Sequence, residues 1–227
     1  MGKMIELTAS DGHKLGAYRA DPGGANAAKP RGAIVVIQEI FGVNSHIKSV
    51  ADGFAADGYV AIAPAMFDRA QKNFDVGYTP PDIEKGRALR AKITVDMAMK
   101  DAQAAVNEAK KAGKVGIVGY CWGGFVVWMA AASVPDLACA VSYYGFAVTN
   151  RIELQPGCPV MLHFGAKDAM IPLDGVERLK AAHPSQQVFV YDEADHGFNC
   201  DPRGSYHAPS AKLARERTLS FFRQHIG

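Results

Sequence analysis

The sequence predicts an α/β fold with a mainly parallel central sheet and helices on both of its faces. Short apolar runs rich in Val and Ile alternate with longer stretches of helical periodicity, which is the pattern of a doubly wound sheet. The apolar runs are also continuous, as expected of parallel strands that are buried on both faces.

The predicted elements follow one another in a simple order. Residues 4–8 and 14–19, separated by Ser10-Asp11-Gly12, predict an N-terminal β-hairpin. Residues 66–81 lack periodicity and predict a long loop. Apolar runs predict strands over 33–38, 59–63, 114–118, 137–144, 159–164 and 187–191. Helical periodicity predicts helices over 46–57, 82–111 with a break near 92–96, 125–132, 174–182 and 209–225.

The central motif lies at residues 114–128, KVGIVGYCWGGFVVW. A strand, a tight turn between small residues and a helix match the nucleophile elbow, Gly-x-nucleophile-x-Gly, with Cys121 as the nucleophile. Glycines beside it avoid collisions with the adjacent strand and helix. The start of the helix favours the thiolate, because unpaired N–H groups and the positive end of the dipole lie there. A buried structural cysteine in a glycine-rich turn fits the same pattern, so the motif alone leaves both interpretations open.

Four chemically capable side chains directly follow predicted strands. They are Glu39, Cys121, Asp168 and His196. Ligands of doubly wound sheets bind outside the carboxyl ends of the strands. We therefore expect these four residues to share one site.

The order Cys121, Asp168, His196 along the chain is that of the nucleophile, acid and base in elbow-containing hydrolases. We expect Cys121 to attack a carbonyl, His196 to act as the base and Asp168 to orient it. Taken singly, Asp168 also fits a helix cap or turn, and His196 a surface loop. The oxyanion donors are expected to be the main-chain N–H groups of Ile40 and Trp122.

The composition predicts a globular protein of one domain, which we place at residues 1–227. The hydrophobic fraction of 48% and the charged fraction of 21% are ordinary. A net charge of +2 without a basic block gives no reason to expect nucleic acid or a membrane as a partner. The N-terminus lacks the apolar run of a secretory signal, and the four cysteines are scattered. We therefore expect a reduced, cytoplasmic setting and no metal site.

Several motifs together resemble the dienelactone hydrolase family, also called carboxymethylenebutenolidase, a branch of the α/β-hydrolases. The resemblance extends over most of the chain, and the combination of Gly-Tyr-Cys-x-Gly-Gly with Gln-Glu-Ile-Phe-Gly is specific. The resembling segments are QEIFGVN (38–44), VGIVGYCWGG (115–124), YYG (143–145), HFGAKDAMIP (163–172), DHGFNC (195–200) and RGSYH (203–207).

The resemblance implies the α/β-hydrolase fold and a Cys–His–Asp triad, here Cys121, His196 and Asp168. It also implies a role for Glu39, whose counterpart in the family interacts with the thiol in the resting enzyme and helps to create the thiolate when substrate binds. A carboxylate that is shielded from water has a raised pKa and can exchange a proton with a thiol. Alternatively, Glu39 is a solvated glutamate at a strand end.

Residues that hold the substrate are less sharply indicated. Family members that act on dienelactone hold its carboxylate with arginines, one before the long helix and one shortly after the catalytic histidine. Here Cys200 stands four residues after His196, and Arg203 lies three residues further on. For the first arginine, Lys85, Arg87 and Arg90 are all candidates. Our candidate substrate-binding residues are Phe41, Arg87, Tyr144 and Arg203.

The sequence therefore predicts a cofactor-independent hydrolase of a small, activated ester or lactone, acting as a monomer or small homo-oligomer. Two alternatives remain open. The first is a thiol-dependent esterase or acyl transferase with an unrelated carbonyl substrate. The second is a non-catalytic binding protein with the same fold, whose Cys121 would react like an ordinary buried thiol.

Overall fold

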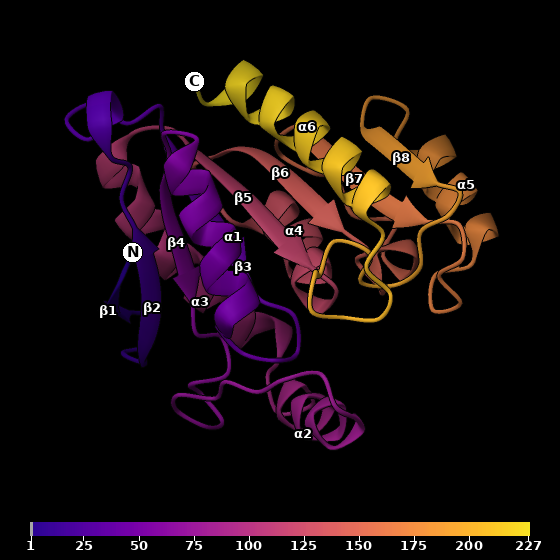
Figure 1. The fold of residues 1–227 in the computed structure, drawn as a ribbon, viewed down its shortest axis with the longest axis horizontal. Helices are drawn as coiled ribbons and strands as arrows, with labels where there is room; N and C mark the ends of the chain where they lie inside the picture. The colour runs from indigo at the N-terminus through magenta and orange to yellow at the C-terminus, as the bar shows by residue number, and fades with distance from the viewer. Residues whose placement is uncertain (1) are drawn as a thin grey trace.

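The computed structural model describes residues 2–227, and its eight strands form one sheet in the order β1-β2-β4-β3-β5-β6-β7-β8 (Figure 1). β1 pairs antiparallel with β2, and β2 with β4, while all other neighbouring strands are parallel. This confirms the mainly parallel sheet and the N-terminal hairpin. The strands are β1 (Lys3–Thr8), β2 (Lys14–Ala20), β3 (Ala33–Ile37), β4 (Val60–Pro64), β5 (Val115–Tyr120), β6 (Leu137–Tyr143), β7 (Val160–Gly165) and β8 (Gln187–Tyr191).

Six α-helices accompany these strands in the described part of the chain. They are α1 (Ser45–Ala56), α2 (Pro80–Arg90), α3 (Val95–Ala109), α4 (Trp122–Ser133), α5 (Leu173–Ala182) and α6 (Ala208–His225). The long loop expected over 66–81 contains no helix before Pro80. No helix within residues 2–227 combines the length and the apolar character needed to cross a bilayer.

The predicted helix over 82–111 is two separate helices, α2 and α3. Thr79 caps α2 through a capping box with Asp82, and prolines occupy its first turn. Thr94 caps α3 by accepting a hydrogen bond from the Met97 N–H at 3.2 Å. These local signals set the break at residues 91–94, close to the expected position.

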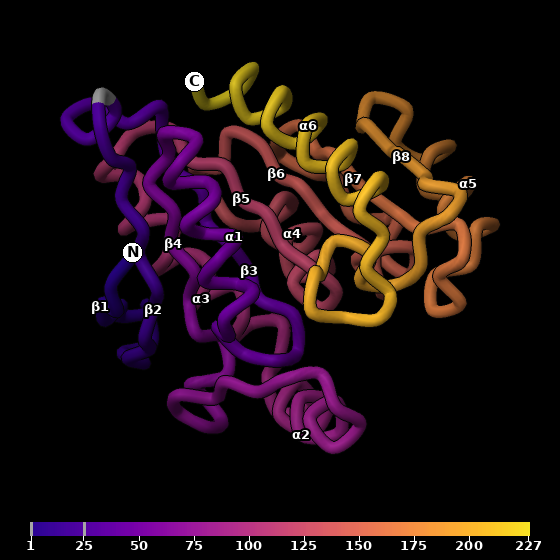
Figure 2. Tube along the Cα trace, viewed as in Figure 1, coloured from indigo at the N-terminus to yellow at the C-terminus, as the bar shows by residue number. Residues whose placement is uncertain are grey.

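Helices cover both faces of the sheet, and the strands in its middle are buried. α1 and α6 pack on one face and α3 and α4 on the other (Figure 1). In the Cα trace of Figure 2, α6 returns to lie beside α1, where Arg215 donates to Asp57 at 2.6 Å. Every residue of β3, β4 and β5 is buried, which explains their continuous apolar sequences. α2 stands clear of the sheet at the bottom of the view in Figure 1.

Candidate active site

Cys121 occupies the turn between β5 and α4 in a conformation that side chains rarely adopt. Its backbone angles are φ 55° and ψ −117°, and such strain persists only where the surroundings enforce it. A Cβ on Gly119 would meet the Gly123 carbonyl oxygen at 2.2 Å, and one on Gly123 would meet the Gln38 carbonyl oxygen at 2.5 Å. The glycines of the elbow therefore let β3, β5 and α4 approach one another at the sulfur.

His196 and Asp168 complete a chain of hydrogen bonds to this sulfur. His196 Nε2 lies 3.1 Å from Cys121 Sγ, and Nδ1 lies 2.8 Å from Asp168 Oδ2. The other Asp168 oxygen accepts the Met170 N–H at 2.9 Å, which fixes the carboxylate. Asp168 follows β7 and His196 follows β8, so the carboxyl ends of three strands supply the three groups.

The surroundings of His196 favour its charged form. Burial by itself lowers the pKa of the imidazole, but the hydrogen bonds to Asp168 and Cys121, together with their negative charges, outweigh burial and raise the pKa to about 10. The ring proton is therefore held more firmly than in a free histidine. An imidazolium beside a sulfur stabilises the thiolate, which is the nucleophilic form of cysteine.

Glu39 follows β3 and is 1% exposed, so it is not the solvated strand-end glutamate of the alternative interpretation. Its Oε1 accepts a hydrogen bond from Arg203 Nη1 at 3.3 Å. Its Oε2 has no hydrogen-bond partner within residues 2–227. The carboxylate also contributes, after burial, to raising the pKa of the neighbouring Cys200 thiol. The structure thus pairs Glu39 with Arg203 and leaves one of its oxygens free to receive another donor.

The residues of the two expected oxyanion donors lie at one cavity. Ile40 and Trp122 both line the cavity that contains Cys121. Neither main-chain N–H donates a hydrogen bond to another group of residues 2–227. The Trp122 N–H is also the first of α4, where the positive end of the helix dipole lies. Unpaired donors beside a nucleophile form an oxyanion hole if the reacting oxygen lies between them.

The cavity has a volume of about 290 Å³, which suits a small organic molecule. The cavity is lined mainly by apolar side chains, together with the three arginines Arg87, Arg90 and Arg203. Arg87 and Arg90 form no ion pair with any other residue in the described part of the chain. The complete lining is Ile40, Phe41, Ile83, Arg87, Arg90, Cys121, Trp122, Phe146, Met170, His196 and Arg203.

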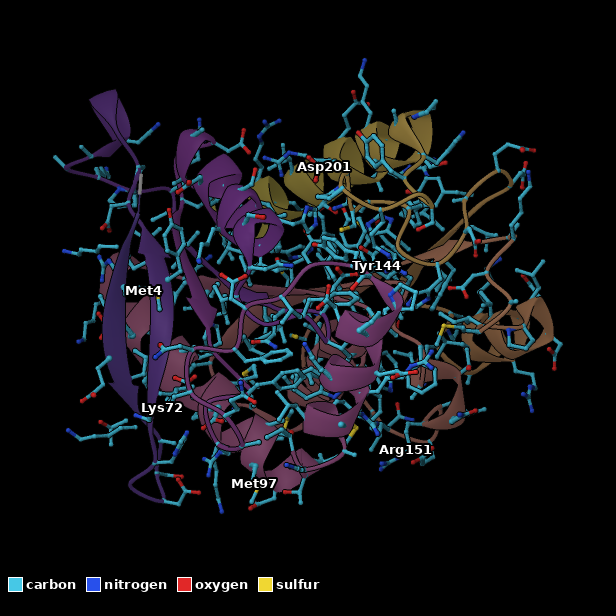
Figure 3. The ribbon with its side chains drawn as sticks, turned by 60° about the horizontal axis from the view of Figure 1, so that its bottom comes forward. Met4, Lys72, Met97, Tyr144, Arg151 and Asp201 are labelled. Carbon is cyan, nitrogen blue, oxygen red and sulfur yellow. The ribbon has the colours of Figure 1, made fainter. Side chains whose placement is uncertain are left out.

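Of the four candidate substrate-binding residues, the structure places Phe41, Arg87 and Arg203 in the lining but not Tyr144. The Tyr144 side chain is fully buried, and its ring meets the His196 ring edge-on with centroids 5.2 Å apart. Figure 3 labels Tyr144 near the middle of the view, and Asp201 near the yellow C-terminal helix. A positive φ of 38° turns Tyr144 into the interior, which sequence reasoning could not foresee. Its contact is with the His196 imidazole and not with the cavity.

Sequence reasoning missed Ile83, Phe146 and Met170 as lining residues, and left Arg90 as one of three candidates. One signal was available on α2. Ile83, Arg87 and Arg90 follow the spacing i, i+4, i+7, which places them on one helix face. Lys85, the third candidate, points elsewhere and lines a different depression beside Phe74. Within residues 2–227, no three His, Cys, Asp or Glu side chains gather as a metal site would require.

Comparisons with known proteins return one recurring family. A family model described as "Dienelactone hydrolase family" matches residues 15–226. The chain is 36% identical over 212 residues to a "Putative carboxymethylenebutenolidase" of Synechocystis sp., covering 85% of this chain and 86% of the relative. It is 31% identical over 230 residues to the "Carboxymethylenebutenolidase" of Pseudomonas putida, covering 96% and 94%. The crystal structure of a "Putative Dienelactone Hydrolase" from Klebsiella pneumoniae superposes with a TM-score of 0.83 at 33% identity, over 99% of each chain.

Proposed function

The chain belongs to the dienelactone hydrolase family and is a hydrolase of carboxylic esters; from this premise we propose that it opens small, activated, anionic esters or lactones through a Cys121–His196–Asp168 triad and a thioester intermediate. One observation carries the proposal: an unbroken chain of hydrogen bonds runs from the Asp168 carboxylate through His196 to the Cys121 sulfur at the cavity wall.

Acylation begins once the Cys121 thiolate has formed beside the His196 imidazolium. The Cys121 sulfur forms a bond to the substrate carbonyl carbon, and the carbonyl electron pair moves onto oxygen. The main-chain N–H groups of Ile40 and Trp122 donate to that oxyanion. When the intermediate collapses, the bond to the leaving oxygen breaks, and His196 gives its proton to the departing alkoxide or enolate oxygen. The acyl group remains on sulfur as a thioester.

Deacylation uses the imidazole that has lost its proton. His196 Nε2 accepts a proton from water, and the resulting hydroxide attacks the thioester carbonyl. The second tetrahedral intermediate expels the Cys121 thiolate, and the carboxylic acid product leaves. The sum is one ester and one water converted to one acid and one alcohol or enol, with the enzyme returned to its starting protonation.

A sulfur nucleophile restricts the range of substrates. Thiolate is a better leaving group than alkoxide, so an intermediate with a poor leaving group expels sulfur and reverts. We therefore propose that the substrates are enol lactones or aryl-like esters, with weak turnover of simple alkyl esters. The arginines of the cavity add a preference for a negatively charged substrate. Arg87 and Arg90 line the cavity and form no ion pair within residues 2–227, so a substrate carboxylate can pair with them.

Arg203 links substrate charge to Glu39. A substrate carboxylate that approaches Arg203 competes with Glu39 for the guanidinium group, because both are anions and Arg203 lines the cavity. Loss of that hydrogen bond leaves the buried Glu39 carboxylate without a donor. The protonated thiol of Cys121 would then donate its proton to Glu39. This sequence of events would make the thiolate available when an anionic substrate is present.

The test compares Cys121→Ala with Cys158→Ala, a cysteine remote from the triad that provides the matched control. With a carboxylated nitrophenyl ester, Cys121→Ala should lower kcat/KM by at least about 10³-fold, as for other triads, and Cys158→Ala should leave it unchanged. Mass spectrometry of the quenched wild-type reaction should find one acyl group on Cys121. Full activity in Cys121→Ala contradicts the proposal, and tight substrate binding without turnover or acylation favours a binding protein instead.

A further inference from the structure

Gln38 begins the motif that supplies Glu39 and Ile40, yet it has no role in the chemistry derived above. It lies directly after β3 and is completely buried. Its side-chain Nε2 donates to the Glu39 carbonyl oxygen at 3.2 Å, and its Oε1 accepts the Met66 N–H at 3.1 Å. Because a carbonyl only accepts and an N–H only donates, these two partners define the orientation of the amide.

The hydrogen bond to Glu39 acts on the peptide that carries an oxyanion donor. The Glu39 carbonyl and the Ile40 N–H belong to the same planar peptide group. In a trans peptide the C=O and N–H bonds point in opposite directions, and the described chain contains no cis peptide. A donor that holds the carbonyl on the Gln38 side therefore directs the N–H away from Gln38.

We propose that Gln38 is a positioning residue that aims the Ile40 N–H at the oxyanion. This inference rests on the acyl-transfer chemistry proposed for Cys121. The hydrogen bond on the carbonyl also polarises the peptide, which makes its N–H a stronger donor. Holding the donor in place before the reaction matters, because a preorganised dipole needs no reorientation in the transition state.

The anchor of Gln38 is itself connected to the second oxyanion donor. Met66, which donates to the Gln38 side chain, is followed by Phe67, whose ring packs on the Trp122 ring with centroids 5.1 Å apart. The Gln38 main chain also meets the first turn of α4, where a Cβ on Gly123 would approach its carbonyl oxygen to 2.5 Å. Residues 66–67 thus contact Gln38, which precedes one oxyanion donor by two residues, and Trp122, which carries the other.

The experiment uses Gln38→Met, which keeps the volume of the side chain but loses both hydrogen bonds. Gln186→Met is the matched control, because the Gln186 amide likewise holds a main-chain N–H, that of Val160, at 2.6 Å and away from the cavity. Two rates are measured for each variant. Acylation by a carboxylated nitrophenyl ester passes through an oxyanion, whereas alkylation of Cys121 by iodoacetamide does not.

We expect Gln38→Met to slow acylation by about 10- to 100-fold, less than the loss of a whole oxyanion donor. KM should change little, and the alkylation rate should stay within about twofold of wild type, because sulfur and imidazole are untouched. Gln186→Met should lower the melting temperature without changing either rate. Equal slowing of acylation and alkylation in Gln38→Met, or unchanged acylation, overturns the inference.

Gln38→Glu provides a second arm in case Gln38→Met does not fold. A glutamate keeps the acceptor for the Met66 N–H, but it donates to the Glu39 carbonyl only when protonated. Acylation by this variant, relative to alkylation at the same pH, should therefore rise as the pH falls, and a flat ratio contradicts the inference. If wild-type Cys121 is not acylated at all, the proposed function fails first. If it is acylated and Gln38 proves neutral, only the inference fails.

Discussion

The pKa of His196 is raised at a position where burial alone would lower it. The ring is 8% exposed, and only the carboxylate on one side and the sulfur on the other make the charged form favourable. Because its pKa of about 10 lies above the usual 6.5, the folded protein holds a proton that the unfolded chain releases between these values. The contribution of His196 to the free energy of unfolding is therefore complete below pH 6.5 and is lost as the pH rises through 10.

This charge can be observed directly. The ¹⁵N chemical shifts of the His196 ring should remain those of an imidazolium at pH 8, where an ordinary histidine is neutral. In Cys121→Ala the titration should move to lower pH, because the hydrogen bond and the charge of the sulfur are among its causes. A ring that titrates near 6.5 in the wild-type protein would contradict this account of the triad.

Individual residues differ in how far the sequence could predict them. Cys121 could be placed in the turn between β5 and α4 because its glycines are adjacent in the sequence and act locally. His196 and Asp168 could be placed because each follows an apolar strand, and parallel strands end at one edge. Tyr144 could not be placed, since its direction depends on a single positive φ at the end of β6. The pairing of Glu39 with Arg203 joins residues 164 positions apart and has no local signal.

α2 is the element that gives the cavity its charge. α2 contacts the main chain of Ile40 at Gly86. Only glycine fits there, because a Cβ would lie 2.1 Å from the Ile40 carbonyl oxygen. This close approach brings Arg87 and Arg90 to the cavity while Lys85 lies on another side of the helix. Thr79 marks the start of α2 in the sequence and Thr94 the start of α3, but the direction in which α2 presents its arginines depends on the tertiary contact at Gly86.

The arginine face of α2 predicts a difference between substrates. Arg90→Gln should raise KM for a carboxylated aryl ester by about tenfold, which corresponds to one lost charge-assisted hydrogen bond, and should leave a neutral aryl ester unaffected. Lys85→Gln, on the same helix but outside the cavity, serves as the control and should change neither value. Equal effects of Arg90→Gln on both esters would show that the residue acts on the fold of α2 and not on substrate charge.

At the scale of the whole molecule, the sheet could be predicted more completely than the connections around it. Continuous apolar runs such as AIVVI and VGIVGY encode β3 and β5 strongly. The polar segment after β4 has no such pattern, yet it ties distant parts together. Its Arg69 forms two hydrogen bonds of 2.8 Å to Asp101 on α3 and further bonds of 3.0 and 3.1 Å to Asp11 in the hairpin turn. Composition alone gives no indication of that network.

This network should affect stability and not catalysis. Asp101 is completely buried, and burial raises its pKa despite the neighbouring Arg69. Arg69→Met leaves the carboxylate buried without its partner, so the free energy of unfolding at pH 7 should fall by about 3–5 kcal/mol. The loss should shrink as the pH is lowered, because protonation removes the buried charge. Urea denaturation tests this, and kcat of the folded fraction should be unchanged; a loss below about 1 kcal/mol would contradict it.

The packing of α2 against the site through Gly86 has a consequence for how substrate selectivity can be altered. The residues of the proposed triad and oxyanion hole follow β3, β5, β7 and β8, whereas two of the three cavity arginines lie on the single segment between Thr79 and Ala91. Replacing α2 with another helix that keeps a glycine at position 86 would change the side chains that line the cavity. The residues that follow the strands would stay the same. Substrate selectivity can then be altered by replacing about a dozen residues, while the residues proposed to carry out the reaction are left unchanged.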